Sequence, residues 1–90
     1  MDRGLKAFLA VAQEGSITAA ASKINLTQSS VTKRIATLES EIGVSLFYRD
    51  RRGMSLTEAG QLFLLRAERI EQEYQHGMEE LAIIRDAGIS

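Results

Sequence analysis

A chain of 90 residues without cysteine is long enough for one small domain, and it excludes a disulfide framework and a thiolate metal site. No apolar run approaches the roughly 20 residues of a membrane span, and no signal-peptide pattern is visible, so we expect a cytoplasmic protein that contacts no membrane. The net charge of -1 does not exclude a nucleic-acid partner, because residues 1–56 carry eight basic and five acidic side chains, whereas residues 57–90 carry three and seven.

Two amphipathic helices are predicted first, of which the second is short. The apolar face of the first helix is formed at helical spacing by Leu5, Phe8, Leu9 and Ala12. Gly15 follows as a stop signal. The same spacing recurs over a shorter stretch in Ile17, Ala20, Ala21 and Ile24. We expect the side-chain oxygen of Thr18 to cap the first turn of this second helix.

A tight turn and a third helix come next. Asn25 tolerates left-handed backbone angles, Thr27 is placed to cap the helix, and Gly43 lies where the helix should end. Leu26 and Val31 occupy the two positions of a hydrophobic staple, which fixes the angle at which the chain enters the helix. The buried stripe of this helix is predicted to consist of Val31, Ile35, Leu38 and Ile42.

The helical period is lost between residues 44 and 56, where we predict a two-stranded hairpin. Short apolar stretches flank a charged tip, which consists of Arg49, Asp50, Arg51, Arg52 and Gly53. Thr57 is then placed to cap a final helix, and Glu58 in its first turn lies toward the positive end of the helix dipole.

The final helix carries a heptad stripe. From Gly60 onward apolar and small residues are spaced alternately three and four apart, which is typical of a coiled-coil seam. A helix of about 30 residues would reach about 45 Å, longer than a small domain can cover, so part of the stripe must meet another chain. The expected dimerisation residues are Phe63, Ala67, Ile70, Tyr74, Gly77, Leu81 and Ile84. We therefore divide the chain into a globular part, residues 1–57, and a linker and dimerisation helix, residues 58–90.

The second and third helices match the pattern of a helix-turn-helix, whose second helix enters the major groove of DNA. Small polar side chains on its first turns suit this groove, because bulky ones would hold the helix away from the base edges. Gln28 offers an amide that can pair with adenine, while Lys33 and Arg34 can reach guanine or phosphate. The basic hairpin is placed to contact the neighbouring backbone or minor groove. The pattern therefore predicts sequence-specific binding to double-stranded DNA.

Other interpretations of these residues are weaker. Gln28 could belong to the polar first turn of any capped helix, and the basic hairpin tip could only protect a strand edge. An enzyme is poorly supported, because His76 is the one histidine, and Glu39 and Glu41 fall on different helix faces. No catalytic residue, metal ligand or cofactor is predicted. A protein-interaction module remains an alternative. DNA binding that weakens as salt is raised would distinguish a DNA-binding domain from such a module.

The chain resembles the LysR-type transcriptional regulators. The resemblance is free of gaps, covers residues 5 to about 66 and extends beyond them only in helical character. Its motifs are Gly15-Ser16-Ile17-Thr18-x-Ala20-Ala21-x-x-Ile24, Thr27-Gln28-Ser29-Ser30-Val31-Thr32-x-x-Ile35-x-x-Leu38-Glu39, Ile42-Gly43-x-x-Leu46-Phe47-x-Arg49-x-x-Arg52 and Leu56-Thr57-x-Ala59-Gly60. Many members have proline where this chain has Ser29.

The resemblance implies a mostly α fold, a winged helix-turn-helix of three helices and a two-stranded hairpin wing, followed by a long C-terminal linker helix. It also implies a homodimer or tetramer on an interrupted palindromic operator, with the recognition helix 28–42 in the major groove and the wing 46–56 on the backbone or minor groove. The expected DNA-binding residues are Thr18, Thr27, Gln28, Ser29, Ser30, Thr32, Lys33, Arg34, Arg49, Arg51 and Arg52.

Family members also carry a C-terminal domain that binds a small-molecule effector, so we expect this chain to be a fragment of a longer regulator. The molybdate-responsive regulators, which use a similar winged module, are the alternative among DNA-binding proteins.

Overall fold

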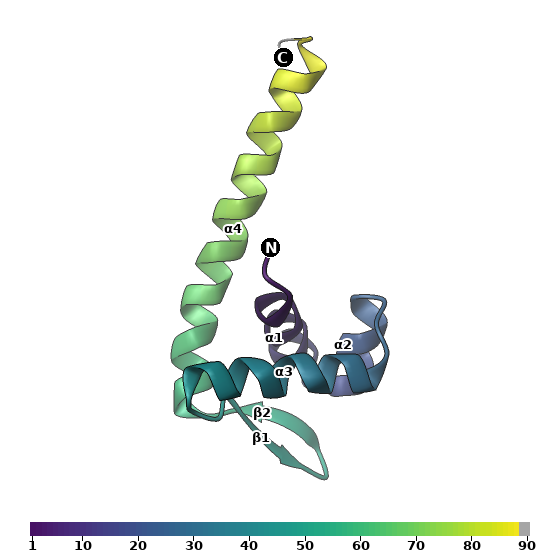
Figure 1. The fold of residues 1–90 in the computed structure, drawn as a ribbon, viewed down its shortest axis with the longest axis vertical. Coiled ribbons are helices and arrows are strands. Elements are labelled where there is room, and N and C mark those ends of the chain that lie inside the picture. The colour runs from purple at the N-terminus through teal and green to yellow at the C-terminus, as the bar shows by residue number, and fades with distance from the viewer. Residues whose placement is uncertain (89–90) are drawn as a thin grey trace.

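Three helices, a hairpin and a long final helix make up the computed structural model, which describes residues 1–88 (Figure 1). In chain order the elements are α1 (Arg3–Glu14), α2 (Ile17–Lys23), α3 (Gln28–Ile42), β1 (Phe47–Asp50), β2 (Gly53–Leu56) and α4 (Glu58–Asp86). The predicted fold class, a winged helix-turn-helix followed by a long C-terminal helix, is confirmed. No helix within the described part of the chain combines the length and apolar character that crossing a membrane requires.

The beginnings and ends of the first two helices follow from short polar side chains and one glycine. Asp2 caps α1, since its Oδ1 accepts a hydrogen bond from the Leu5 amide at 3.0 Å, and Gly15 ends the helix in the left-handed conformation. The predicted Thr18 cap is wrong. Ser16 caps α2 instead, accepting from the Ala19 amide at 3.1 Å, because the helix already begins at residue 17. Thr18 lies exposed in the first turn of α2.

The turn before α3 has the predicted geometry. Asn25 is left-handed with φ of 56°, and the hydroxyl oxygen of Thr27 accepts from the Ser30 amide at 3.1 Å. Gly43, with φ of 85°, ends the helix. The predicted burial of Ile42 is wrong, because its side chain lies beyond the core and is 44% exposed. It borders a surface groove between the end of α3 and the start of α4.

The core lies where α1, α2 and α3 meet the base of the hairpin and the start of α4. Its largest fully buried side chains are Phe8, Val11, Val31 and Leu46. The Phe8 ring packs against Phe47 and Phe63, with ring centroids 5.3 and 4.8 Å apart. One side chain of α1 therefore holds both the hairpin and the long helix in place.

The hairpin is tied to the helices at both of its ends. The Glu39 carboxylate accepts from the backbone amides of Leu46 and Phe47, at 2.6 and 3.3 Å, which fixes the start of the first strand against α3. The Met54 amide donates to the carbonyl of Gly15 at 3.0 Å. A Cβ on Gly53 would lie 2.5 Å from that same oxygen, so only glycine fits here. The position of the wing is therefore fixed relative to the helix-turn-helix.

The strand register makes the charged tip shorter than the sequence suggested. Asp50 pairs with Gly53 at the end of the antiparallel ladder, so Arg51 and Arg52 form the turn, while Arg49 belongs to β1. Asp50 Oδ1 accepts from the Arg52 amide at 2.8 Å, which helps to hold the turn.

The long helix begins inside the domain and leaves it. Thr57 caps α4 by accepting from the Gly60 amide at 2.9 Å, and its hydroxyl donates to the Ser45 carbonyl at 2.8 Å. Ala67 is fully buried against the core. Beyond it α4 runs past the other elements (Figure 1).

Candidate nucleic-acid interface

The outer face of α3 presents small polar side chains to solvent at the start of the helix. Gln28, Ser29 and Lys33 are exposed and Thr32 is half-buried, whereas Val31 on the opposite side is fully buried. Because the buried side fixes the rotation of the helix, Gln28, Ser29, Thr32 and Lys33 lie together on one surface. Ser29 and Thr32 on this surface are short enough for a helix to approach base edges closely.

Hydrogen bonds at the start of α3 separate capping residues from those left available. The Thr27 hydroxyl donates to Ser30 Oγ at 2.8 Å and accepts from the Ser30 amide, so its function in this structure is to cap the helix. The Ser30 hydroxyl accepts from Thr27 and keeps its own proton available for another partner. Gln28 has no hydrogen bond to another side chain within the described residues.

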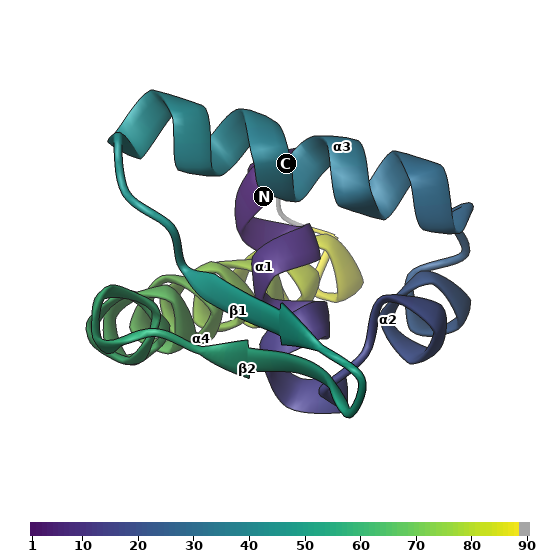
Figure 2. The ribbon, with the colours of Figure 1, turned by 90° about the horizontal axis from the view of Figure 1, so that it is seen from below.

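The wing lies along one flank of α3 (Figure 2). A hollow between the two is lined by Thr32, Ala36 and Glu39 from α3 and by Phe47, Arg49 and Met54 from the hairpin. Arg49 thus lies beside the helix, while Arg51 and Arg52 are exposed at the turn. None of these three arginines forms an ion pair with a carboxylate in the described part of the chain.

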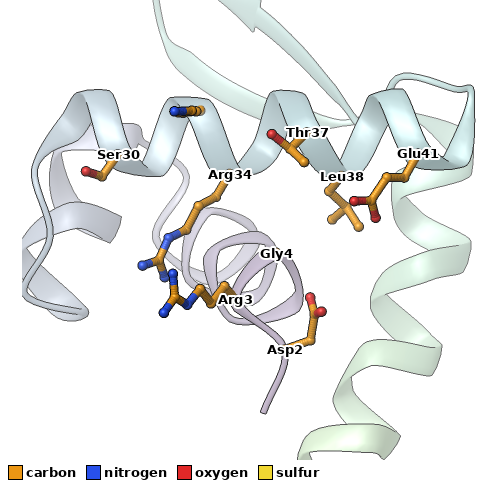
Figure 3. A pocket seen from close by; sticks show the side chains of 9 residues that line it. Asp2, Arg3, Gly4, Ser30, Arg34, Thr37, Leu38 and Glu41 are labelled. Atoms are coloured by element: carbon orange, nitrogen blue, oxygen red, sulfur yellow. The ribbon is translucent and has the colours of Figure 1, made fainter.

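The other flank of α3 faces the start of α1, where a groove holds the predicted residues Ser30, Lys33 and Arg34 together with Arg3, which the sequence did not predict. Arg3 and Arg34 share this groove (Figure 3), and Lys33 also lines it. Sequence reasoning assigned Arg3 no role, because it lies 31 positions from Arg34 and no local pattern connects the two. The only indication of Arg3 in the sequence is that it is a basic residue at the start of a helix.

The predicted dimerisation stripe of α4 divides into two parts. Phe63 packs on Phe8 and Ala67 has no exposed surface, so these two residues contribute to the core of their own chain. The remaining large residues of the stripe are about half exposed: Ile70, Tyr74, Leu81 and Ile84. Gly77 lies among them, and a Cβ added to it would meet no atom within 4 Å. His76 is exposed on the same helix.

Comparison with known proteins agrees with this geometry. The sequence model of the bacterial regulatory helix-turn-helix proteins of the lysR family matches residues 3–61. The HTH-type transcriptional regulator YofA of Bacillus subtilis (strain 168) is 50% identical over 66 residues, which cover 73% of this chain and 23% of YofA. The chain spans about a quarter of the length of the curated relatives that it matches.

Solved structures of protein and DNA together are also similar. The CbnR_DBD–DNA complex is 40% identical with a TM-score of 0.80, covering 92% of this chain and 98% of that one. The BenM_DBD complex with catB site 1 DNA is 30% identical with a TM-score of 0.88, covering 94% and 97%. The similarity therefore extends over nearly all of this chain, α4 included.

Proposed function

The chain belongs to the lysR family of bacterial regulatory helix-turn-helix proteins, and on that premise we propose that it is the part of a transcriptional regulator that binds double-stranded DNA by sequence. One observation carries the proposal. The outer face of α3 is small, polar and exposed at its first turns, and the basic wing lies along its flank. We also propose that the regulator is cytoplasmic and that it is not an enzyme.

The proposed mechanism assigns base contacts to α3 and backbone contacts to the wing. The first two turns of α3 enter the major groove, where Gln28 pairs with adenine and Ser29 and Thr32 lie against neighbouring bases. Arg51 and Arg52 neutralise phosphates or enter the adjacent minor groove. Base contacts supply specificity, whereas phosphate contacts supply affinity for any sequence.

The exposed half of α4 supports assembly with a second copy. A homodimer would place two α3 helices about one DNA turn apart, roughly 34 Å, on the half-sites of an interrupted palindrome. We also propose that this chain is part of a longer protein that forms tetramers. A further domain of that protein would bind a small-molecule effector.

Equilibrium titrations at one fixed salt concentration test the function. A duplex selected by the wild-type chain from a random pool is compared with an unrelated duplex. Gln28→Ala should cost about 1 to 3 kcal/mol on the selected duplex and much less on the unrelated one. Gln72→Ala, which changes an exposed glutamine on α4, is the matched control and should change neither affinity.

Arg52→Ala should behave differently, weakening both duplexes by similar factors because it removes a phosphate contact. Equal losses for Gln28→Ala on the two duplexes would move Gln28 to the phosphate-contacting class. A wild-type chain whose binding to both duplexes is absent, even at low salt, would contradict DNA binding and favour a protein-interaction module.

A further inference from the structure

Two arginines from distant parts of the sequence meet in one groove beside α3. Arg3 extends from the first turn of α1, and Arg34 extends from the second turn of α3 toward the same space (Figure 3). Ser30 lies at the same end of the groove (Figure 3). Arg34 is half-buried, so its stem is held by its surroundings, whereas Arg3 is exposed.

This end of the groove carries positive charge that no carboxylate neutralises. Within residues 1–88 neither arginine has a carboxylate oxygen within 4 Å. The two acidic residues of the groove, Asp2 and Glu41, lie at its opposite end (Figure 3), and Asp2 is engaged in capping α1. Two guanidinium groups that share a site repel each other. An anion between them would attract both groups and offset that repulsion.

The groove lies on the flank of α3 that the wing does not occupy. Thr32 and Ala36 line the hollow on the wing side, whereas Ser30, Arg34 and Thr37 line the groove on the α1 side. A helix in the major groove lies between two sugar-phosphate backbones, one along each flank. If the wing contacts one backbone, the groove faces the other.

We propose that Arg3 and Arg34 jointly bind one phosphate of the DNA backbone that borders the major groove on the side opposite the wing. The Ser30 hydroxyl, whose proton is not used by Thr27, can donate a further hydrogen bond to the same phosphate. The proposal rests on the proposed DNA binding and adds to it a second anchor, so that α3 is held from both flanks.

The salt dependence of binding tests this assignment. Arg3→Ala, Arg34→Ala and the double variant are titrated with the selected and the unrelated duplex over a series of salt concentrations. Each single variant should lose about tenfold in affinity on both duplexes. The slope of log K against log salt should become shallower by about 0.9, the value for one phosphate. Because both side chains hold the same phosphate, the double variant should lose about the same slope and not twice as much.

Lys6→Ala is the matched control, because it removes one positive charge from α1 on a face that lines a different pocket, toward α4. It should leave the slope unchanged. Neutral methylphosphonate linkages, placed one at a time in the selected duplex, provide an independent measurement. One position should weaken the wild type about tenfold and leave the double variant unaffected.

An Arg3→Ala variant with the slope and affinity of Lys6→Ala would overturn the shared phosphate site. So would an Arg34→Ala variant that loses affinity for the selected duplex alone. Both outcomes leave the proposed function intact as long as the wild type binds in a salt-dependent manner, whereas absence of such binding overturns both. Circular dichroism of each variant verifies that the fold is retained.

Discussion

The two halves of α4 share one heptad stripe but have opposite surroundings. In the first half Gly60 and Ala67 are buried, and Phe63 packs against the ring of Phe8. In the second half the large residues of the same stripe, such as Ile70 and Leu81, remain about half exposed. The first half of one continuous stripe therefore packs into the core of its own chain, and the second half forms an exposed apolar surface. Periodicity shows which side of a helix is apolar, but it does not show which partner covers that side.

The largest effect is expected at Gly60, in the anchored half. A Cβ at this position would overlap with the carbonyl oxygen of Leu46 and lie 2.9 Å from Leu56 Cδ2. The Leu46 carbonyl cannot move away freely, because it accepts from the Thr57 amide at 3.0 Å. Gly60→Ala should lower the free energy of unfolding by about 3 kcal/mol or more. Urea denaturation followed by circular dichroism measures it, and an unchanged midpoint would contradict this close approach of α4 to the hairpin.

Features decided within a few residues could be predicted from the sequence. Thr27 and Thr57 cap their helices as expected, because the capping oxygen and the amide that it satisfies lie three positions apart. Asn25 and Gly43 adopt the left-handed conformations that their residue types allow. The one local error, Thr18 in place of Ser16, arose because two hydroxyl residues compete for the same cap and only the position of the helix start decides between them.

Features decided by distant contacts could not be predicted. Ile42 continues the buried stripe of α3 in sequence, yet no element covers the last turn of that helix completely. Ala67 looks like a seam residue until α1 is placed against it. In the candidate interface the α3 face followed from helical spacing, whereas the proximity of Arg3 to Arg34 depends on how α1 crosses α3. The DNA contacts of these residues remain predictions.

The second half of α4 can be tested by placing a charge on its stripe. Ile70 is 49% exposed, so Ile70→Asp should leave the fold of the single chain intact. In a homodimer that pairs along the stripe, the new carboxylate would be buried without a partner in both copies. We expect the dissociation constant of the dimer to rise at least about a hundredfold, which corresponds to about 2.8 kcal/mol. Sedimentation equilibrium over a range of concentrations measures it.

Leu65→Asp is the matched control for this experiment. Leu65 lies on the same helix and is 50% exposed, but it falls outside the stripe. The control should associate like the wild type. Equal dissociation of both variants would show that charge anywhere on α4 disrupts the dimer. A wild type that stays monomeric at high concentration would contradict the intermolecular function of the stripe.

The smallest effect is expected at Gly77, in the exposed half of α4. Replacement of glycine by alanine should have the opposite effect on stability here to the one expected at Gly60. A Cβ on Gly77 meets nothing within 4 Å, in contrast to Gly60, so the single chain should accept alanine without strain. Alanine in an exposed helix is favoured over glycine by about 0.5 to 1 kcal/mol, because it restricts the unfolded chain more. Gly77→Ala should therefore raise the free energy of unfolding by this amount at concentrations below dimer formation.

Within a paired stripe, however, the glycine at position 77 lets two helices approach closely, and the added methyl groups of both copies would hold them apart. Self-association should consequently weaken while the stability of the single chain increases, and sedimentation combined with urea denaturation at low concentration measures the two effects separately. An association constant equal to that of the wild type would mean that no partner helix comes close to Gly77.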